Sequence, residues 1–129
     1  MTPDDRRYTK THEWIKIEDD VALVGITDYA QEALGDITFV ELPTVGDHLE
    51  QGGESGVIES VKAASDLNAP IAGTISEVNS LLEESPETIN LSPYEDGWLY
   101  KLKNFSEEDA QSLMEADQYE ASLEEEEEE

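Results

Sequence analysis

The residue best placed to do chemistry is Lys62, which stands between two β-type runs of sequence. The first run covers residues 55–61 and the second covers residues 73–78, with a predicted turn directly after the lysine. Its neighbours Val61 and Ala63 are uncharged, so this lysine is not placed to form a structural ion pair within the turn. The pattern predicts an amine at a hairpin tip, where another protein can reach it and modify it.

Other groups that could catalyse a reaction are scarce. The chain has no Cys, which excludes a disulfide framework and a thiolate metal site. Its two histidines, His12 and His48, are too few for a His-rich metal site, and each lies where surface or packing histidines are common. No segment has the ligand spacing of a calcium loop or the glycines of a phosphate-binding loop. We therefore expect no catalytic residues, no metal site and no enzymatic activity.

The charge balance is strongly acidic. Seven Lys and Arg stand against 33 Asp and Glu in 129 residues, for a net charge of −26. Nucleic acids and anionic membranes are bound through clusters of Lys and Arg, so neither is expected as a partner. Three explanations of the acidity stay open: a solvated surface, steering toward partners with basic rims, and adaptation to a high-salt cytoplasm.

Length and hydropathy predict a single soluble domain. The chain has the length of one domain, and no apolar run approaches the length of a membrane span. Its N-terminus lacks the apolar segment of a signal peptide, so we expect a cytoplasmic protein. We predict one domain over residues 1–123, followed by a disordered acidic tail at residues 124–129, because like charges repel.

The predicted elements are mostly short strands. Residues 13–17 and 21–26 predict an N-terminal hairpin, and residues 37–42 and 97–102 predict two further strands. We expect residues 1–10 to be mobile. Many strands with few helices indicate a mainly β fold, either a sandwich or a barrel with peripheral helices.

Helix signals are few and lie at the edges of this pattern. Asp28 is predicted to cap a short helix, with Gln31 reaching back to it and Gly35 ending it. Asn79 is predicted to cap a helical turn at residues 80–84, before a loop at residues 85–94. Ser106 is predicted to cap a C-terminal helical region.

Six segments, in order along the chain, resemble the glycine cleavage system H-protein family. They are YTKTHEW (8–14), VGITDYAQEALG (24–35), FVELP (39–43), ESVKAASDLNAP (59–70), GTISEVN (73–79) and SPYEDGW (92–98). The resemblance implies a barrel-sandwich hybrid, in which two small β-sheets surround a hairpin lysine and helices follow at the C-terminus. It also implies a carrier without catalytic activity, expected here as a monomer.

The residues around the lysine distinguish between two prosthetic groups of this wider fold. Biotin carriers place Met on both sides of the lysine, whereas this chain has Val61 and Ala63. Lipoyl domains of 2-oxo acid dehydrogenases usually have Asp where Val61 stands. The resemblance therefore implies lipoate, joined to Lys62 by an amide, with Glu59 contributing to recognition by the lipoyl-attaching enzyme.

The resemblance also implies partners and a cleft. The lipoyl arm would take an aminomethyl group from a pyridoxal-phosphate glycine decarboxylase and deliver it to a tetrahydrofolate-dependent aminomethyltransferase. A flavin (FAD) dihydrolipoyl dehydrogenase would reoxidise the arm. Thr11, Glu13 and Asp66 would contact the cationic amine in a surface cleft. Two alternatives stay open: a lipoate relay that supplies other enzymes, and an acidic adaptor in which Lys62 is unmodified.

Overall fold

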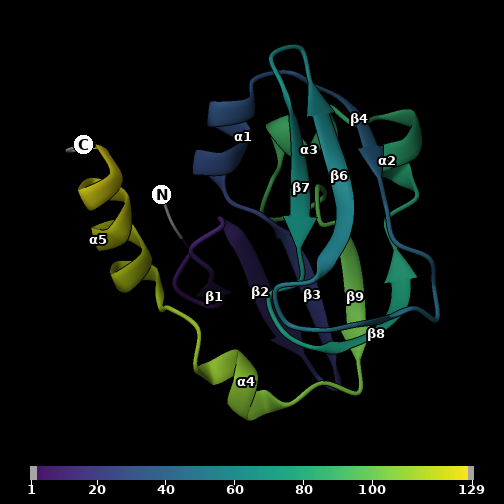
Figure 1. Cartoon of the computed structure of the whole chain (residues 1–129), viewed down its shortest axis with the longest axis vertical. Coiled ribbons are helices and arrows are strands. Elements are labelled where there is room, and N and C mark those ends of the chain that lie inside the picture. Colours follow the sequence, from purple (N-terminus) through teal and green to yellow (C-terminus); the bar gives the residue numbers. More distant parts are fainter. Residues whose placement is uncertain (1–2, 128–129) are drawn as a thin grey trace.

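The protein consists of two antiparallel β-sheets, shown in the computed structural model of Figure 1, which describes residues 3–127, with side chains up to residue 123. The larger sheet has six strands in the order β1 (Arg7–Tyr8), β2 (Glu13–Glu18), β3 (Val21–Ile26), β9 (Tyr100–Lys103), β8 (Gly73–Val78) and β5 (His48–Leu49). The smaller sheet has three strands in the order β4 (Ile37–Glu41), β6 (Glu54–Ser60) and β7 (Ala64–Asn68). The predicted mainly β fold is confirmed, but the run at residues 73–78 does not form the second strand of the Lys62 hairpin: it is β8 of the larger sheet, and β6 pairs instead with β7, where a turn was predicted.

The core lies between the two sheets. The smaller sheet contributes Ile58 and Leu67, and the larger sheet contributes Val24, Ile75 and Leu102, all 3 % exposed or less. Alternate residues of a strand point to opposite faces of a sheet, so these inward side chains leave the intervening residues on the outside. The β6–β7 hairpin thus has one face fixed in the core and its turn at the end of the molecule (Figure 1).

The prediction that residues 1–10 are mobile is wrong for the part that includes β1, and residues 1–2 lie outside the described residues. Tyr8 is fully buried and its ring stacks on that of Tyr119, with 4.9 Å between centroids. The Arg6 guanidinium lies over the Trp14 ring, 4.7 Å from its centroid. Cation–π and stacking contacts hold this polar segment. Tyr119 lies far from Tyr8 in sequence, so the local composition does not reveal this contact.

Helix α1 (Asp28–Leu34) begins one residue earlier than predicted. Thr27, and not Asp28, is the N-cap, and its hydroxyl accepts a hydrogen bond from the Ala30 amide at 3.2 Å. Asp28 lies in the first turn, where its charge is favourable at the positive end of the helix. Gln31 does reach back to Asp28, at 2.8 Å, and Gly35 ends the helix with a φ of +80° as predicted.

The segment between β8 and β9 contains more helix than predicted. Asn79 caps nothing, because its side-chain amide donates to the carbonyls of Asp96 and Trp98, each at 2.8 Å. Helix α2 (Leu81–Glu84) follows it, and the predicted loop contains a second short helix, α3 (Thr88–Leu91). Asn90 of α3 accepts a hydrogen bond from the Ile37 amide at 2.9 Å, which ties this segment to β4. Strand β9 begins at Tyr100, later than predicted.

Two helices close the chain. Ser106 caps α4 (Glu107–Gln111) as predicted, accepting from the Asp109 amide at 3.4 Å. Helix α5 (Ala116–Glu127) then runs beside the N-terminal segment (Figure 1). It extends into the predicted disordered tail as far as Glu127, consistent with the high helix propensity of glutamate, and residues 128–129 lie outside the described residues. Within residues 3–127, no helix is long and apolar enough to cross a membrane.

Candidate functional site

Lys62 lies in a tight turn that Ser60 builds. The Ser60 amide donates to the Ala63 carbonyl at 2.8 Å, and the Ser60 hydroxyl accepts from the amides of Lys62 and Ala63, each at 3.2 Å. The Val61 amide donates to the Asp36 carbonyl at 3.0 Å, which fixes the turn against the end of α1. The sequence reasoning did not single out Ser60. Its signal is a hydroxyl two residues before the lysine, where it can bond the turn amides.

The Lys62 side chain is exposed and makes no ion pair with the residues that the structure describes. The aliphatic part of the Lys62 side chain passes over Gly35, and a Cβ added at Gly35 would lie 3.2 Å from the Lys62 Cε. Val61 is 67 % exposed, and Glu59, Ala63 and Lys62 are exposed as well. The predicted attachment residues therefore gather at one accessible end of the hairpin.

Glu13 is a buried carboxyl group at the start of β2. Its side chain is 3 % exposed. One carboxylate oxygen accepts hydrogen bonds from the hydroxyls of Thr9, at 2.8 Å, and Thr11. The other accepts from the Asn68 amide of β7 at 3.4 Å. Burial raises the pKa of Glu13 above its usual value, while these hydrogen bonds act in the opposite direction.

Glu13 lies in the wall of a cleft of about 430 Å³. The cleft is lined by Tyr8, Thr9, Lys10, Thr11, Glu13, Gln51, Gly52, Asn68, Ala69, Pro70, Ser112, Leu113 and Met114. Carboxylate and hydroxyl oxygens at one place, with apolar side chains around them, suit a cationic group on an apolar chain.

The structure brings Thr11 and Glu13 together and places Asp66 apart from them. Asp66 is exposed on β7, two residues before Asn68, and makes no hydrogen bond or ion pair to Thr11 or Glu13 within the described part of the chain. It lies on β7 between the turn that carries Lys62 and the end of the strand at Asn68. Thr9 and Asn68 both donate hydrogen bonds to Glu13, and neither was among the predicted cleft residues.

The backbone beside Glu13 is fixed by α5. His12 adopts a φ of 71°, and its carbonyl accepts from the Thr27 amide at 3.0 Å. The Tyr119 hydroxyl lies 2.7 Å from the His12 Nδ1 and 2.7 Å from the Thr27 hydroxyl. One hydroxyl of α5 therefore joins the segment that carries Thr11 and Glu13 to the cap of α1.

We expect Tyr119→Phe to lower the free energy of unfolding by about 1–2 kcal/mol, because buried hydrogen-bonding groups lose a partner while the ring stack on Tyr8 remains. Urea unfolding measures this change. The matched control is Tyr29→Phe, since the Tyr29 ring also contacts His12 but its hydroxyl makes no hydrogen bond to a described residue. Equal unfolding midpoints for the two variants would contradict the assigned role of Tyr119.

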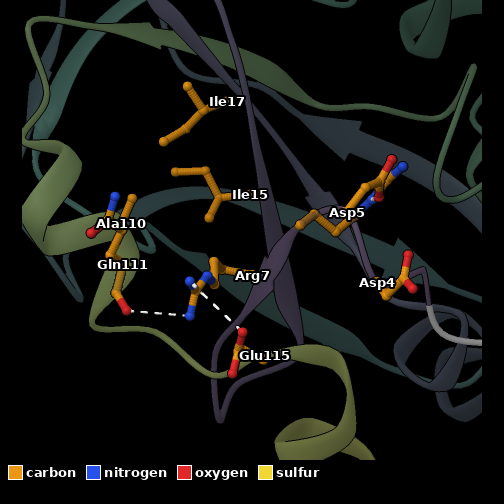
Figure 2. A pocket seen from close by; sticks show the side chains of 9 residues that line it. Asp4, Asp5, Arg7, Ile15, Ile17, Ala110, Gln111 and Glu115 are labelled. Atoms are coloured by element: carbon orange, nitrogen blue, oxygen red, sulfur yellow. Dashed lines mark hydrogen bonds and ion pairs between the residues drawn. The ribbon is translucent and has the colours of Figure 1, made fainter.

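A second cavity, of about 310 Å³, lies beside β1 and α4 (Figure 2). Arg7 reaches across it to the Gln111 carbonyl at 3.3 Å and to Glu115 at 4.0 Å. The side chains of Ile15 and Ile17 lie on the other wall. Through these contacts Arg7 joins the N-terminal strand to the segment before α5. The residues that line this cavity and those that line the cleft at Glu13 do not overlap, so the two are separate.

The chain is similar to known proteins over most of its length. The sequence model of the family "Glycine cleavage H-protein" matches residues 6–126. A glycine cleavage system H protein of Alcanivorax borkumensis is 52 % identical over 121 residues, which cover 94 % of each chain. One of Thermus thermophilus is 54 % identical over 122 residues, with 95 % of each chain covered.

A solved structure gives the same result for the fold. The crystal structure of a glycine cleavage system H protein from Mycobacterium marinum superposes with a TM-score of 0.86 and 42 % sequence identity. The match covers 94 % of this chain and 98 % of that one. The resemblance inferred from the six segments is confirmed: the chain belongs to the glycine cleavage H-protein family.

Proposed function

We propose that this protein is the lipoyl-bearing carrier of a glycine cleavage system, with lipoate joined by an amide to the Nζ of Lys62. The observation that carries the proposal is Lys62 itself, an exposed amine at a tight turn without an ion-pair partner in the described residues. Membership of the glycine cleavage H-protein family supports the same role.

The residues around Lys62 fit this prosthetic group. Ala63 and Ala64 are small and exposed, so they leave the base of an arm narrow. No acidic side chain of the described residues holds the Lys62 amine, so forming the amide breaks no ion pair. Lipoate, when bound, supplies a disulfide that undergoes thiol–disulfide exchange and carries electrons and an aminomethyl group.

The chain's own contribution is to hold the cargo, which is the aminomethyl group on the lipoyl arm, and to keep water from it. Glu13 supplies a negative charge to the cationic amine, and Thr11 orients that carboxylate through its hydroxyl. Asp66, part of the way along β7, supplies a second negative charge to the path between Lys62 and the cleft. Leu113 and Met114 line the cleft with apolar atoms, which limits access of water to the amine.

The proposed partners are a glycine decarboxylase, a tetrahydrofolate-dependent aminomethyltransferase, a dihydrolipoyl dehydrogenase and a lipoyl-attaching enzyme. In this role the protein is a monomeric carrier, and the catalytic groups belong to the partners. A tether at Lys62 raises the local concentration of the arm at each partner in turn. The acidic surface favours encounter with basic rims. The cytoplasm is the proposed location.

Intact-mass measurement of the protein from its native host tests the proposal, followed by glycine decarboxylation reconstituted with the decarboxylase, the aminomethyltransferase and the dihydrolipoyl dehydrogenase. We expect a lipoyl increment on Lys62 and glycine-dependent release of carbon dioxide. A bare Lys62 would support the acidic adaptor and overturn the carrier. A lipoylated protein that transfers its lipoyl group to other enzymes, but does not support glycine decarboxylation, would identify a lipoate relay.

A further inference from the structure

The three-stranded sheet has an outer face that reaches from Lys62 along both of its neighbouring strands. Register places Phe39 opposite Glu59, and Glu59 opposite Ala64, in the row next to the Ile37–Ser60 pair beside the turn. The next outward-facing row holds Glu41, Val57 and Asp66 in the same way. We call these six residues the outer face.

The side chains of the outer face point away from the core. Their strand neighbours Val40 and Ile58 are 4 % and 1 % exposed, and residues of opposite parity lie on the opposite face of a sheet. Phe39 is 52 % exposed, although burying an aromatic ring is favourable by about 1.5–3 kcal/mol. Phenylalanine is enriched in the cores of protein interfaces, so an exposed Phe39 beside the turn of Lys62 suits an interface anchor.

The charge of the outer face has a single sign. Glu41, Glu59 and Asp66 are exposed, and none of them forms an ion pair with a described residue. Carboxylates that surround an apolar centre are complementary to a basic rim around an apolar socket. A second copy of this chain would place like charges opposite one another, which is unfavourable.

We propose that the outer face is the docking surface for the enzyme that attaches lipoate to Lys62, with Phe39 as its apolar anchor. The proposal rests on the proposed carrier function. Before modification, the Lys62 amine extends from the turn only by the length of its own four-carbon side chain. The attaching enzyme must therefore bring its active site to the turn itself, and contact with the adjacent row follows. Enzymes that act on the completed arm can bind farther away.

Lipoylation kinetics of the full chain with a purified lipoate–protein ligase, lipoate and MgATP test this proposal. In this reaction the lipoyl carboxyl joins AMP as pyrophosphate leaves. The Lys62 amine then forms an amide with the acyl carbon, the acyl–phosphate bond breaks, and AMP and a proton are released. We expect Phe39→Ala to lower kcat/KM about tenfold or more, mainly through KM, because an aromatic anchor is lost.

Two further variants make the test independent of the stability of Phe39→Ala. Glu41→Gln, at an exposed position, should lower kcat/KM several-fold and weaken its dependence on salt. Val45→Ala is the matched control, since Val45 is 56 % exposed but lies outside the two rows, and its kcat/KM should equal that of the wild type. Thermal unfolding of each variant establishes that it is folded at the assay temperature.

A competition assay separates docking from chemistry. Lys62→Arg protein cannot be lipoylated, so it should inhibit lipoylation of the wild type, and adding Phe39→Ala to it should raise the inhibition constant about tenfold. If Phe39→Ala and Glu41→Gln were both lipoylated with the kinetics of the wild type, the docking surface would be overturned and the carrier function would remain intact. A homodimer that Phe39→Ala disrupts would assign the face to a second copy instead. Failure of the ligase to modify the wild type at all would overturn the carrier function itself.

Discussion

Lys62→Arg is expected to abolish lipoylation completely, and glycine decarboxylation in the reconstituted system with it. The guanidinium keeps its proton at any accessible pH and therefore cannot form the amide. The turn should be preserved, because it is held by the Ser60 hydroxyl and by backbone hydrogen bonds. Intact mass measures the lipoyl increment, and release of carbon dioxide from labelled glycine measures the activity.

The matched control is Lys103→Arg, which makes the same Lys-to-Arg replacement at another exposed lysine, on β9. It should be lipoylated and active like the wild type. A lipoyl increment that persists in Lys62→Arg would show that another lysine is the attachment site and would remove the basis of the proposed function.

Glu13→Gln is expected to shorten the lifetime of the amine cargo about tenfold or more, while lipoylation of Lys62 stays unchanged. Glutamine keeps the size of the side chain and can still accept from Thr11, but it offers no negative charge to a cation. Hydrogen bonds to charged groups contribute about 1.5–3 kcal/mol, which corresponds to a change of this size. Release of formaldehyde from the loaded protein, followed over time, measures the lifetime.

Glu18→Gln is the matched control, because Glu18 is an exposed carboxylate at the other end of β2. Its cargo should be retained as long as that of the wild type. An unchanged lifetime in Glu13→Gln would show that the amine is held elsewhere, and Asp66→Asn would then be the next variant to measure.

The burial of Glu13 also predicts a pH dependence of cargo retention. Burial raises the pKa of its carboxyl, so Glu13 takes up a proton at a higher pH than an exposed glutamate does. Only the ionised form attracts the amine. Retention should therefore fall as the pH drops through this raised pKa, and the fall should begin above the usual range for glutamate, about pH 4.3. Loaded Glu13→Gln protein should show no such step.

The proposed attachment site could be predicted from the sequence because the relevant interactions are local. Lys62 and its uncharged neighbours lie within a few residues of the turn that presents them. Strand alternation and the caps at Gly35 and Ser106 are likewise set by residues within one or two turns of chain. Such patterns are visible without knowledge of the fold. They predicted the β class, the first strand of the hairpin and the lysine at its tip, but not β7, which takes the place of the expected second strand.

The cleft and the outer face depend on contacts that only the tertiary structure decides. Glu13 becomes a buried carboxyl because Asn68, 55 residues away, donates to it across the gap between the sheets. The segment beside it is fixed by Tyr119, which is 107 residues from His12. Likewise, Phe39 joins Glu59 and Ala64 in one row only through the register of β4, β6 and β7. A single sequence shows which side chains a strand turns outward, but which strands lie beside it is determined by the packing of the whole core.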